Sequence, residues 1–143
     1  MVLVDGQGIP LGVHLSPANL AESHLAEATL AQVAVPRTGP GRPKQKPQRI
    51  IADRGYDSRP LWLRLKRRGI QLIVPHLSNR VHRYQDGRAL RRYRRRWIIE
   101  RTNAWLHNFR RLVTRYDNKL EHYRAFLYAA CMLITLRQFR NHF

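Results

Sequence analysis

The chain has 143 residues, of which 43% are apolar and 25% charged, a composition that excludes a disordered chain and predicts one compact domain with its own core. The 27 Lys and Arg against 9 Asp and Glu give a formal net charge of +18, which argues against small-molecule metabolism and favours a polyanionic partner. A single cysteine, Cys131, excludes a disulfide framework and a cysteine-based zinc site. We recognise neither a signal peptide nor an apolar run long enough to span a membrane, and therefore expect a soluble protein of a reducing compartment.

Two apolar runs at the start of the chain, 2–4 and 9–15, flank a turn that contains glycine, and this pattern predicts a β-hairpin. A helix is expected next. Asn19 would cap it, with Glu22 as the capping-box partner, and Pro36 would end it.

The middle of the chain predicts a strand, a helix and a second strand. Before them, residues 36–48 hold four of the eight prolines and form a basic Pro/Gly loop rather than a regular element. A short apolar run at 49–53 reads as a strand. The segment 58–69 begins at a capping serine, ends at a glycine and predicts a helix, and 70–74 is the second strand. Two strands joined in this way are parallel, so Asp53 would lie at the carboxyl end of a strand, where open α/β sheets place ligand sites.

The last third of the chain predicts two long helices, 89–115 and 120–140, after a polar, irregular stretch at 76–87. At about 100° per residue, Glu100 faces about 200° away from Ile98 and therefore away from the apolar stripe of the first helix. The expected members of that stripe are Ile98, Thr102, Trp105, Phe109 and Leu112. In the second helix, the expected buried side chains are Tyr123, Phe126, Leu127, Ala130, Cys131, Leu133 and Ile134.

The positive charge is concentrated after residue 35. Residues 1–35 have no Lys or Arg, so all 27 basic residues follow Val35, and only four of them are Lys. Because the planar guanidinium of Arg binds phosphate with two hydrogen bonds, the excess of Arg over Lys favours nucleic acid as the partner. A basic RNA-packing protein remains the alternative that charge alone leaves open.

Two acids stand out in this basic chain. Asp53 follows a predicted strand, and Glu100 follows the densest run of Arg, at 91–96. Separated carboxylates in a basic surround are typical of metal-assisted phosphoryl transfer, in which two Mg²⁺ ions clamp the attacking and leaving oxygens. The alternative is structural: a turn residue after the strand and a surface ion pair on the helix.

Three stretches, 51–58, 74–80 and 93–116, together resemble the C-terminal catalytic part of insertion-sequence transposases of the IS5 family, within the IS4-like group of DDE transposases. The resemblance implies an α/β ribonuclease-H-like fold. It also implies that residues 1–143 form a single catalytic domain that is truncated at its N-terminus and lacks the first strand.

The resemblance implies a transposase that cleaves and joins DNA strands with Mg²⁺. Asp53 matches the second Asp and Glu100 the Glu of the family's Asp, Asp, Glu triad, which binds two Mg²⁺ ions. Asp5 lies one strand too late to be the first Asp, so we expect the chain to be inactive alone. The group's Y-x2-R-x3-E-x6-K signature maps onto Tyr93 and Arg96, with His107 at the position of the Lys.

The implied partner is double-stranded DNA, both the transposon ends and the target, in the bacterial cytoplasm at the nucleoid and with no role for a membrane. A full-length transposase or the product of an upstream reading frame is a further expected partner. The alternatives are a non-catalytic basic DNA-binding fragment and an inert remnant of a transposase. The side chains expected to contact DNA are Arg91, Arg92, Tyr93, Arg94, Arg95, Arg96, Arg101 and His107.

Overall fold

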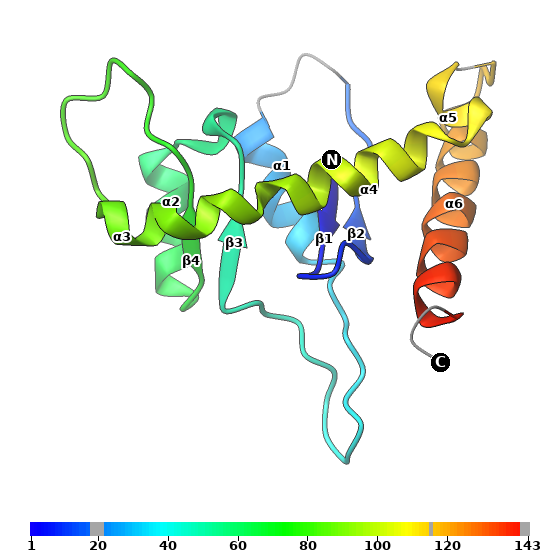
Figure 1. Cartoon of the computed structure of the whole chain (residues 1–143), viewed down its shortest axis with the longest axis horizontal. Coiled ribbons are helices and arrows are strands. Elements are labelled where there is room, and N and C mark those ends of the chain that lie inside the picture. The colour runs from blue at the N-terminus through cyan, green and yellow to red at the C-terminus, as the bar shows by residue number, and fades with distance from the viewer. Residues whose placement is uncertain (18–21, 115, 141–143) are drawn as a thin grey trace.

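The computed structural model describes residues 1–17, 22–114 and 116–140, and it shows a mixed α/β chain with two small sheets (Figure 1). Within these residues, no helix combines the length and the apolar character needed to cross a bilayer.

The first sheet is the hairpin of β1 (Val2–Val4) and β2 (Pro10–Val13), which pair antiparallel as predicted. The Asp5 carboxylate fixes the turn between them, because its Oδ1 accepts hydrogen bonds from the backbone N–H groups of Gln7 at 2.8 Å and Ile9 at 2.9 Å. Gly8 has a φ of +87°, and a Cβ there would lie 2.8 Å from Thr102 Oγ1. Glycine therefore permits the close approach between this turn and the helix that carries Glu100.

Helix α1 (Glu22–Leu30) ends earlier than predicted, well before Pro36. The chain tightens into a turn after Leu30, with Val33 N–H bonded to Leu30 O at 3.1 Å, and Val33 becomes buried. Gln32 accepts a hydrogen bond from Val13 N–H at 3.1 Å, so this turn also serves strand β2. The predicted cap Asn19 lies outside the described residues.

The second sheet confirms the predicted strand, helix and strand. β3 (Arg49–Ile51) and β4 (Gln71–Ile73) are parallel, with Ile50 opposite Leu72, and α2 (Arg59–Arg67) connects them. Gly69, with a φ of +71°, forms the turn after α2. The loop 36–48 contains no helix and no strand, only one isolated bridge between Val35 and Lys44, and it projects away from both sheets (Figure 1).

The helix predicted over 89–115 is divided into four segments. They are α3 (Gly87–Leu90), the 3₁₀ helix η2 (Arg91–Arg96), α4 (Trp97–His107) and α5 (Arg110–Val113). Five of the six residues of η2 are Arg. At Phe109 the backbone is extended, with φ −90° and ψ 100°, and this break separates α4 from α5.

Helix α6 (Leu120–Arg140) has the predicted bounds and packs at one end of the molecule against α4, α5 and β2 (Figure 1). It buries Leu127, Ala130, Cys131 and Ile134. Phe126 and Leu133, which we expected inside, are 36% and 41% exposed, because neighbouring elements cover only one side of the helix. Burial raises the pKa of the Cys131 thiol, which agrees with a core position.

Two apolar clusters stabilise the fold. The first lies between α1, α2 and β4, and side chains of both β1 and β3 pack against it. The second joins β2, α4 and α6. Buried members of the first cluster are Ala26, Leu30, Leu61, Leu65, Ile70, Leu72 and Val74. Those of the second are Val13, Leu106, Leu127, Ala130, Cys131 and Ile134.

Candidate active site

Asp53 lies just after β3, at the carboxyl end of a parallel strand. It is the N-cap of a short 3₁₀ helix, η1 (Arg54–Tyr56), and its Oδ1 accepts a hydrogen bond from Arg54 N–H at 2.6 Å. The backbone contact fixes the side chain, yet half of that side chain stays exposed. Asp53 is therefore held in place and still accessible to a ligand.

Arg96 brings Asp53 and Glu100 together. Its Nη2 lies 3.3 Å from Asp53 Oδ2 and 3.5 Å from Glu100 Oε1. The two carboxylate oxygens are therefore no further apart than the sum of these two distances. The predicted pair of acids, from a strand end and a helix, thus meets around one cationic group.

Tyr93 completes this cluster. Its hydroxyl donates to Asp53 Oδ1 at 3.4 Å and accepts from Arg96 Nη1 at 3.2 Å. The hydrogen bond to Tyr93, together with the charges of Asp53 and Glu100, raises the pKa of Arg96 above its already high ordinary value. We call Asp53, Tyr93, Arg96 and Glu100 the carboxylate cluster.

The change of helix type between η2 and α4 explains the spacing in the carboxylate cluster. In a 3₁₀ helix, residues three apart align, which places Tyr93 and Arg96 on one side. In an α-helix, residues four apart are neighbours, which places Arg96 beside Glu100 at the start of α4. One turn of each helix therefore directs Tyr93 and Arg96 toward Asp53, and Glu100 toward Arg96.

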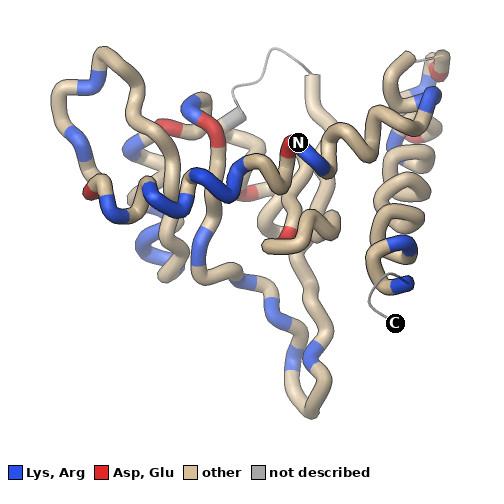
Figure 2. The backbone as a smooth tube through the Cα atoms, viewed as in Figure 1, with Lys and Arg blue, Asp and Glu red and all other residues tan. Residues whose placement is uncertain are grey.

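The DNA-contact residues predicted from the sequence divide into three groups, of which Tyr93 and Arg96 are the first, within the carboxylate cluster. Arg91, Arg92, Arg94, Arg95 and His107 are exposed, and basic residues follow one another along η2 (Figure 2). Arg101 is used within the fold: its guanidinium lies 4.8 Å from the ring centroids of both Trp97 and Trp105 and donates to Gln7 O at 2.6 Å. The spacing of four residues between these three side chains is a signal that our sequence reasoning did not use.

Asp57 is the important polar residue that sequence reasoning missed. Its side chain is fully buried, and its Oδ2 accepts from Leu77 N–H at 2.7 Å and from Arg80 Nε at 2.8 Å. Its Oδ1 accepts from the Tyr84 hydroxyl and lies 3.2 Å from His76 Nδ1. Asp57 thereby ties the irregular stretch after β4 to the start of α2, and we call this group the Asp57 hub.

Contacts within the Asp57 hub shift the pKa values of Asp57 and Tyr84. Burial alone would raise the pKa of Asp57, but the hydrogen bonds from Tyr84, Leu77, His76 and Arg80 outweigh burial and leave the pKa below its ordinary value. Burial and the Asp57 carboxylate raise the pKa of Tyr84, so its hydroxyl remains a donor. Asp57 is therefore a structural carboxylate rather than a free ligand.

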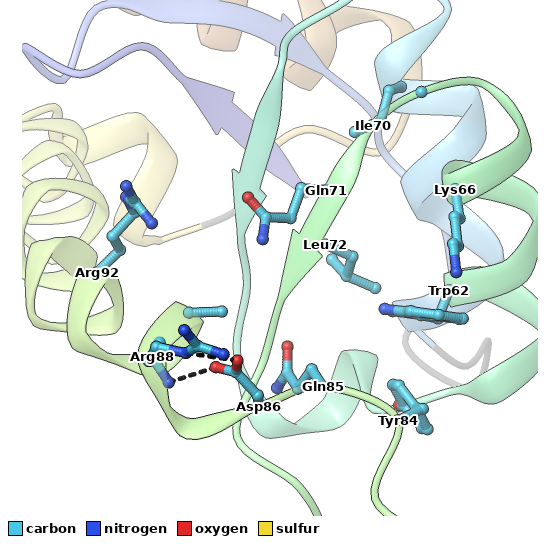
Figure 3. A pocket seen from close by; sticks show the side chains of 12 residues that line it. Trp62, Lys66, Ile70, Gln71, Leu72, Tyr84, Gln85, Asp86, Arg88 and Arg92 are labelled. Carbon is cyan, nitrogen blue, oxygen red and sulfur yellow. Dashed lines mark hydrogen bonds and ion pairs between the residues drawn. The ribbon is translucent and has the colours of Figure 1, made fainter.

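A pocket of about 520 Å³ lies beside β4 and includes Arg92 of η2 in its lining (Figure 3). The Trp62 indole forms part of its wall, with Lys66 Nζ 4.7 Å from the ring centroid and the Tyr84 ring 5.2 Å away. The ion pair between Asp86 and Arg88 lies at its rim. Neither Asp53 nor Glu100 lines this pocket.

The carboxylate cluster offers part of a site for a hard cation. Carboxylate oxygens are the ligands that Mg²⁺ prefers, and Asp53 and Glu100 already face one positive charge. Over residues 1–17, 22–114 and 116–140, no three His, Cys, Asp or Glu side chains gather where they could hold a metal ion. Asp5 is engaged in the hairpin turn, as predicted, and does not join the pair.

A strand-end aspartate and a helical glutamate that meet beside a run of Arg are an arrangement typical of domains for phosphoryl transfer. The comparisons agree: the Transposase DDE domain family matches residues 1–136, and the chain belongs to this family. Membership implies a ribonuclease-H-like fold and a divalent metal ion.

Over 140 residues the chain is 36% identical to a putative transposase for insertion sequence element IS402 from Burkholderia cepacia. The match covers 98% of this chain and 63% of that relative, so the chain spans less than two thirds of the relative's length. No solved structure matches the chain significantly. Placement in the IS5 subgroup stays a prediction.

Proposed function

We propose that the chain is the catalytic part of an insertion-sequence transposase of the IS5 type, acting on DNA by Mg²⁺-dependent strand cleavage and strand transfer in the bacterial cytoplasm. One observation carries the proposal: Asp53 and Glu100, which are distant in the sequence, lie within 3.5 Å of the same guanidinium nitrogen. The structural alternative, in which Asp53 is only a turn residue and Glu100 only forms a surface ion pair, does not require the two acids to share a partner.

The proposed roles follow from position. Asp53 and Glu100 are the metal ligands, and the divalent ions, when bound, stabilise charge on the attacking and leaving oxygens. The exposed Arg of η2 hold the DNA backbone next to these ligands, because phosphate contacts position the duplex without reading its bases. Tyr93 orients Asp53 through its hydroxyl.

The proposed fold is ribonuclease-H-like and lacks one strand. The described strands form two separate pairs, and β1 and β3 pack against the same apolar cluster without pairing with each other. In Figure 1, β1 and β3 are the facing members of the two sheets. One further strand between them would join the pairs into a single sheet, which supports the interpretation of residues 1–143 as one incomplete catalytic domain.

We further propose that the 143-residue chain alone does not cleave DNA. Two carboxylates are a poor ligand set for two divalent ions, and no third acid joins them in the described part of the chain. A full-length transposase or the product of an upstream frame would supply the third. An end-cleavage assay with Mg²⁺ tests this directly, since robust cleavage by the isolated chain would contradict it.

The catalytic proposal is tested in a chimera in which the chain replaces the matching 140 residues of the Burkholderia relative. We expect the chimera to excise a marked insertion element in bacteria, and expect Asp53→Ala or Glu100→Ala to abolish excision while DNA binding persists. The matched control is Glu121→Ala, which removes an exposed carboxylate at the start of α6 and should retain excision. Excision that survives either acid substitution would refute the assignment.

A non-catalytic DNA-binding module is the second candidate, and the exposed Arg of η2 favour it. Such a protein would bind duplex DNA with a steep salt dependence. It would be indifferent to the loss of Asp53 or Glu100, so the same variants separate the two candidates.

A further inference from the structure

The guanidinium of Arg96 lies where a cation would have to lie to contact both carboxylates. It is within 3.3 Å of Asp53 Oδ2 and 3.5 Å of Glu100 Oε1, and the Tyr93 hydroxyl accepts from its other terminal nitrogen at 3.2 Å. The Arg96 side chain therefore neutralises two acids that would otherwise repel each other.

We propose that Arg96 is an internal counter-ion that keeps Asp53 and Glu100 together without metal and must leave before a divalent cation can bind between them. This proposal rests on the metal-ligand role given above to the two acids. Arg96 therefore positions the ligands and also competes with the cation, so it sets the metal affinity of the site.

The burial of the three side chains makes this exchange feasible. Arg96 is 35% exposed, Asp53 50% and Glu100 58%, so water reaches every group of the bridge. Solvated ion pairs are weak, and a divalent ion carries twice the charge of a guanidinium and binds carboxylate oxygens directly. The ion pairs of Arg96 therefore hold the two carboxylates near each other, and a divalent cation can still displace the guanidinium.

A purely structural ion pair makes the opposite prediction. If Arg96 only held the two carboxylates in place, its removal would let them separate, and metal would bind more weakly. If Arg96 competes with the cation, its removal strengthens metal binding. The direction of the change in affinity distinguishes the two roles without any measurement of catalysis.

The test is Mn²⁺ binding to the purified 143-residue chain, followed by the loss of the electron paramagnetic resonance signal of free Mn²⁺. We expect Arg96→Gln to bind Mn²⁺ about tenfold more tightly than the unmodified chain, because one positive charge leaves the contact distance of both carboxylates. Arg96→Lys keeps the charge and should restore the weaker binding. The matched control, Arg95→Gln, removes the same charge from an exposed neighbour and should change the affinity less than twofold, as screening reduces its effect.

Arg96→Gln binding that is no tighter than Arg95→Gln binding, or not detectable at all, would overturn the proposal. Circular dichroism of each variant shows whether it is folded. A second measurement uses the unmodified chain: Mg²⁺ should shift the side-chain Nε–H resonance of Arg96 in ¹⁵N-resolved spectra and leave that of Arg95 in place, and an unmoved Arg96 resonance would also contradict the proposal.

Failure of this inference is distinguishable from failure of the proposed function. In the Arg96→Gln background, Asp53→Asn and Glu100→Gln should each abolish Mn²⁺ binding. If binding survives both substitutions, the metal lies elsewhere and the proposed function itself is wrong. If both substitutions abolish binding but Arg96→Gln alone does not tighten it, only the counter-ion inference is refuted.

Discussion

Asp53 and Asp57 stand four residues apart in one motif and are used in opposite ways. Asp57 is fully buried and receives hydrogen bonds from Leu77, Arg80 and Tyr84. Asp53 is half exposed and shares a single guanidinium with Glu100. A carboxylate whose acceptor positions are filled by the protein stabilises the fold, whereas one with loosely held partners can accept a ligand.

The largest effect that this comparison predicts is on stability. Asp57→Ala removes a fully buried carboxylate that is the common acceptor of a partly buried Arg, a Tyr and a backbone N–H, so we expect the free energy of unfolding to fall by about 3 to 5 kcal/mol. Urea denaturation followed by circular dichroism measures this change. A loss below about 1 kcal/mol would show that water or other groups replace the carboxylate in the Asp57 hub.

The second prediction concerns how the stability contributed by the buried Asp57 carboxylate depends on pH. The folded-state pKa of Asp57 lies below its ordinary value of 3.8. The stabilisation by ionised Asp57 is therefore fully present above that value and is lost as the pH falls through the folded-state pKa. In urea titrations, the difference in unfolding free energy between the unmodified chain and Asp57→Asn should narrow as the pH falls from about 6 to about 3. A constant difference would show that ionisation of Asp57 contributes nothing.

The basic residues extend the comparison to a second pair. Arg101→Gln should lower the free energy of unfolding by about 1 to 2 kcal/mol, because it loses contacts with two indole rings and with Gln7 O. Arg95→Gln should leave stability unchanged and instead reduce the salt slope of duplex DNA binding by about 0.9. DNA-binding titrations at several salt concentrations measure the salt slope of each variant. Equal slopes for Arg101→Gln and Arg95→Gln would contradict the division into a structural Arg and a DNA-contacting Arg.

The smallest expected effect is on the stability of the carboxylate cluster. Asp53→Ala removes an exposed cap hydrogen bond and solvated ion contacts, so the free energy of unfolding should fall by no more than about 1 kcal/mol. Thermal unfolding beside Asp57→Ala provides the comparison. A large destabilisation by Asp53→Ala would mean that Asp53, like Asp57, is structural.

Local signals in the sequence predicted the elements that position Asp53. The glycine-containing turn between two apolar runs predicted the hairpin of β1 and β2. The order of strand, helix and strand, with Gly69 ending the helix, predicted the parallel pair of β3 and β4. These features depend on residues close in sequence, so a pattern is sufficient. The approach of Glu100 to Asp53 was also expected, first as one of two interpretations of two acids in a basic chain and then through the family resemblance.

Features that depend on distant partners were not predictable. The donors of the Asp57 hub come from an irregular stretch that has no periodicity, so no pattern indicated them. The helix expected over 89–115 is divided because the run of Arg winds as a 3₁₀ helix and Phe109 is extended. The exposure of Phe126 and Leu133 follows from how little of α6 its neighbours cover.

The 3₁₀ winding of η2 determines the direction in which the Tyr93 side chain points. Three residues turn the chain by about 360° in a 3₁₀ helix but by about 300° in an α-helix, so rewinding this one segment would swing Tyr93 by about 60° away from Asp53. The winding of η2 therefore sets whether the Tyr93 hydroxyl reaches Asp53, and the same six residues carry most of the basic side chains proposed to contact DNA.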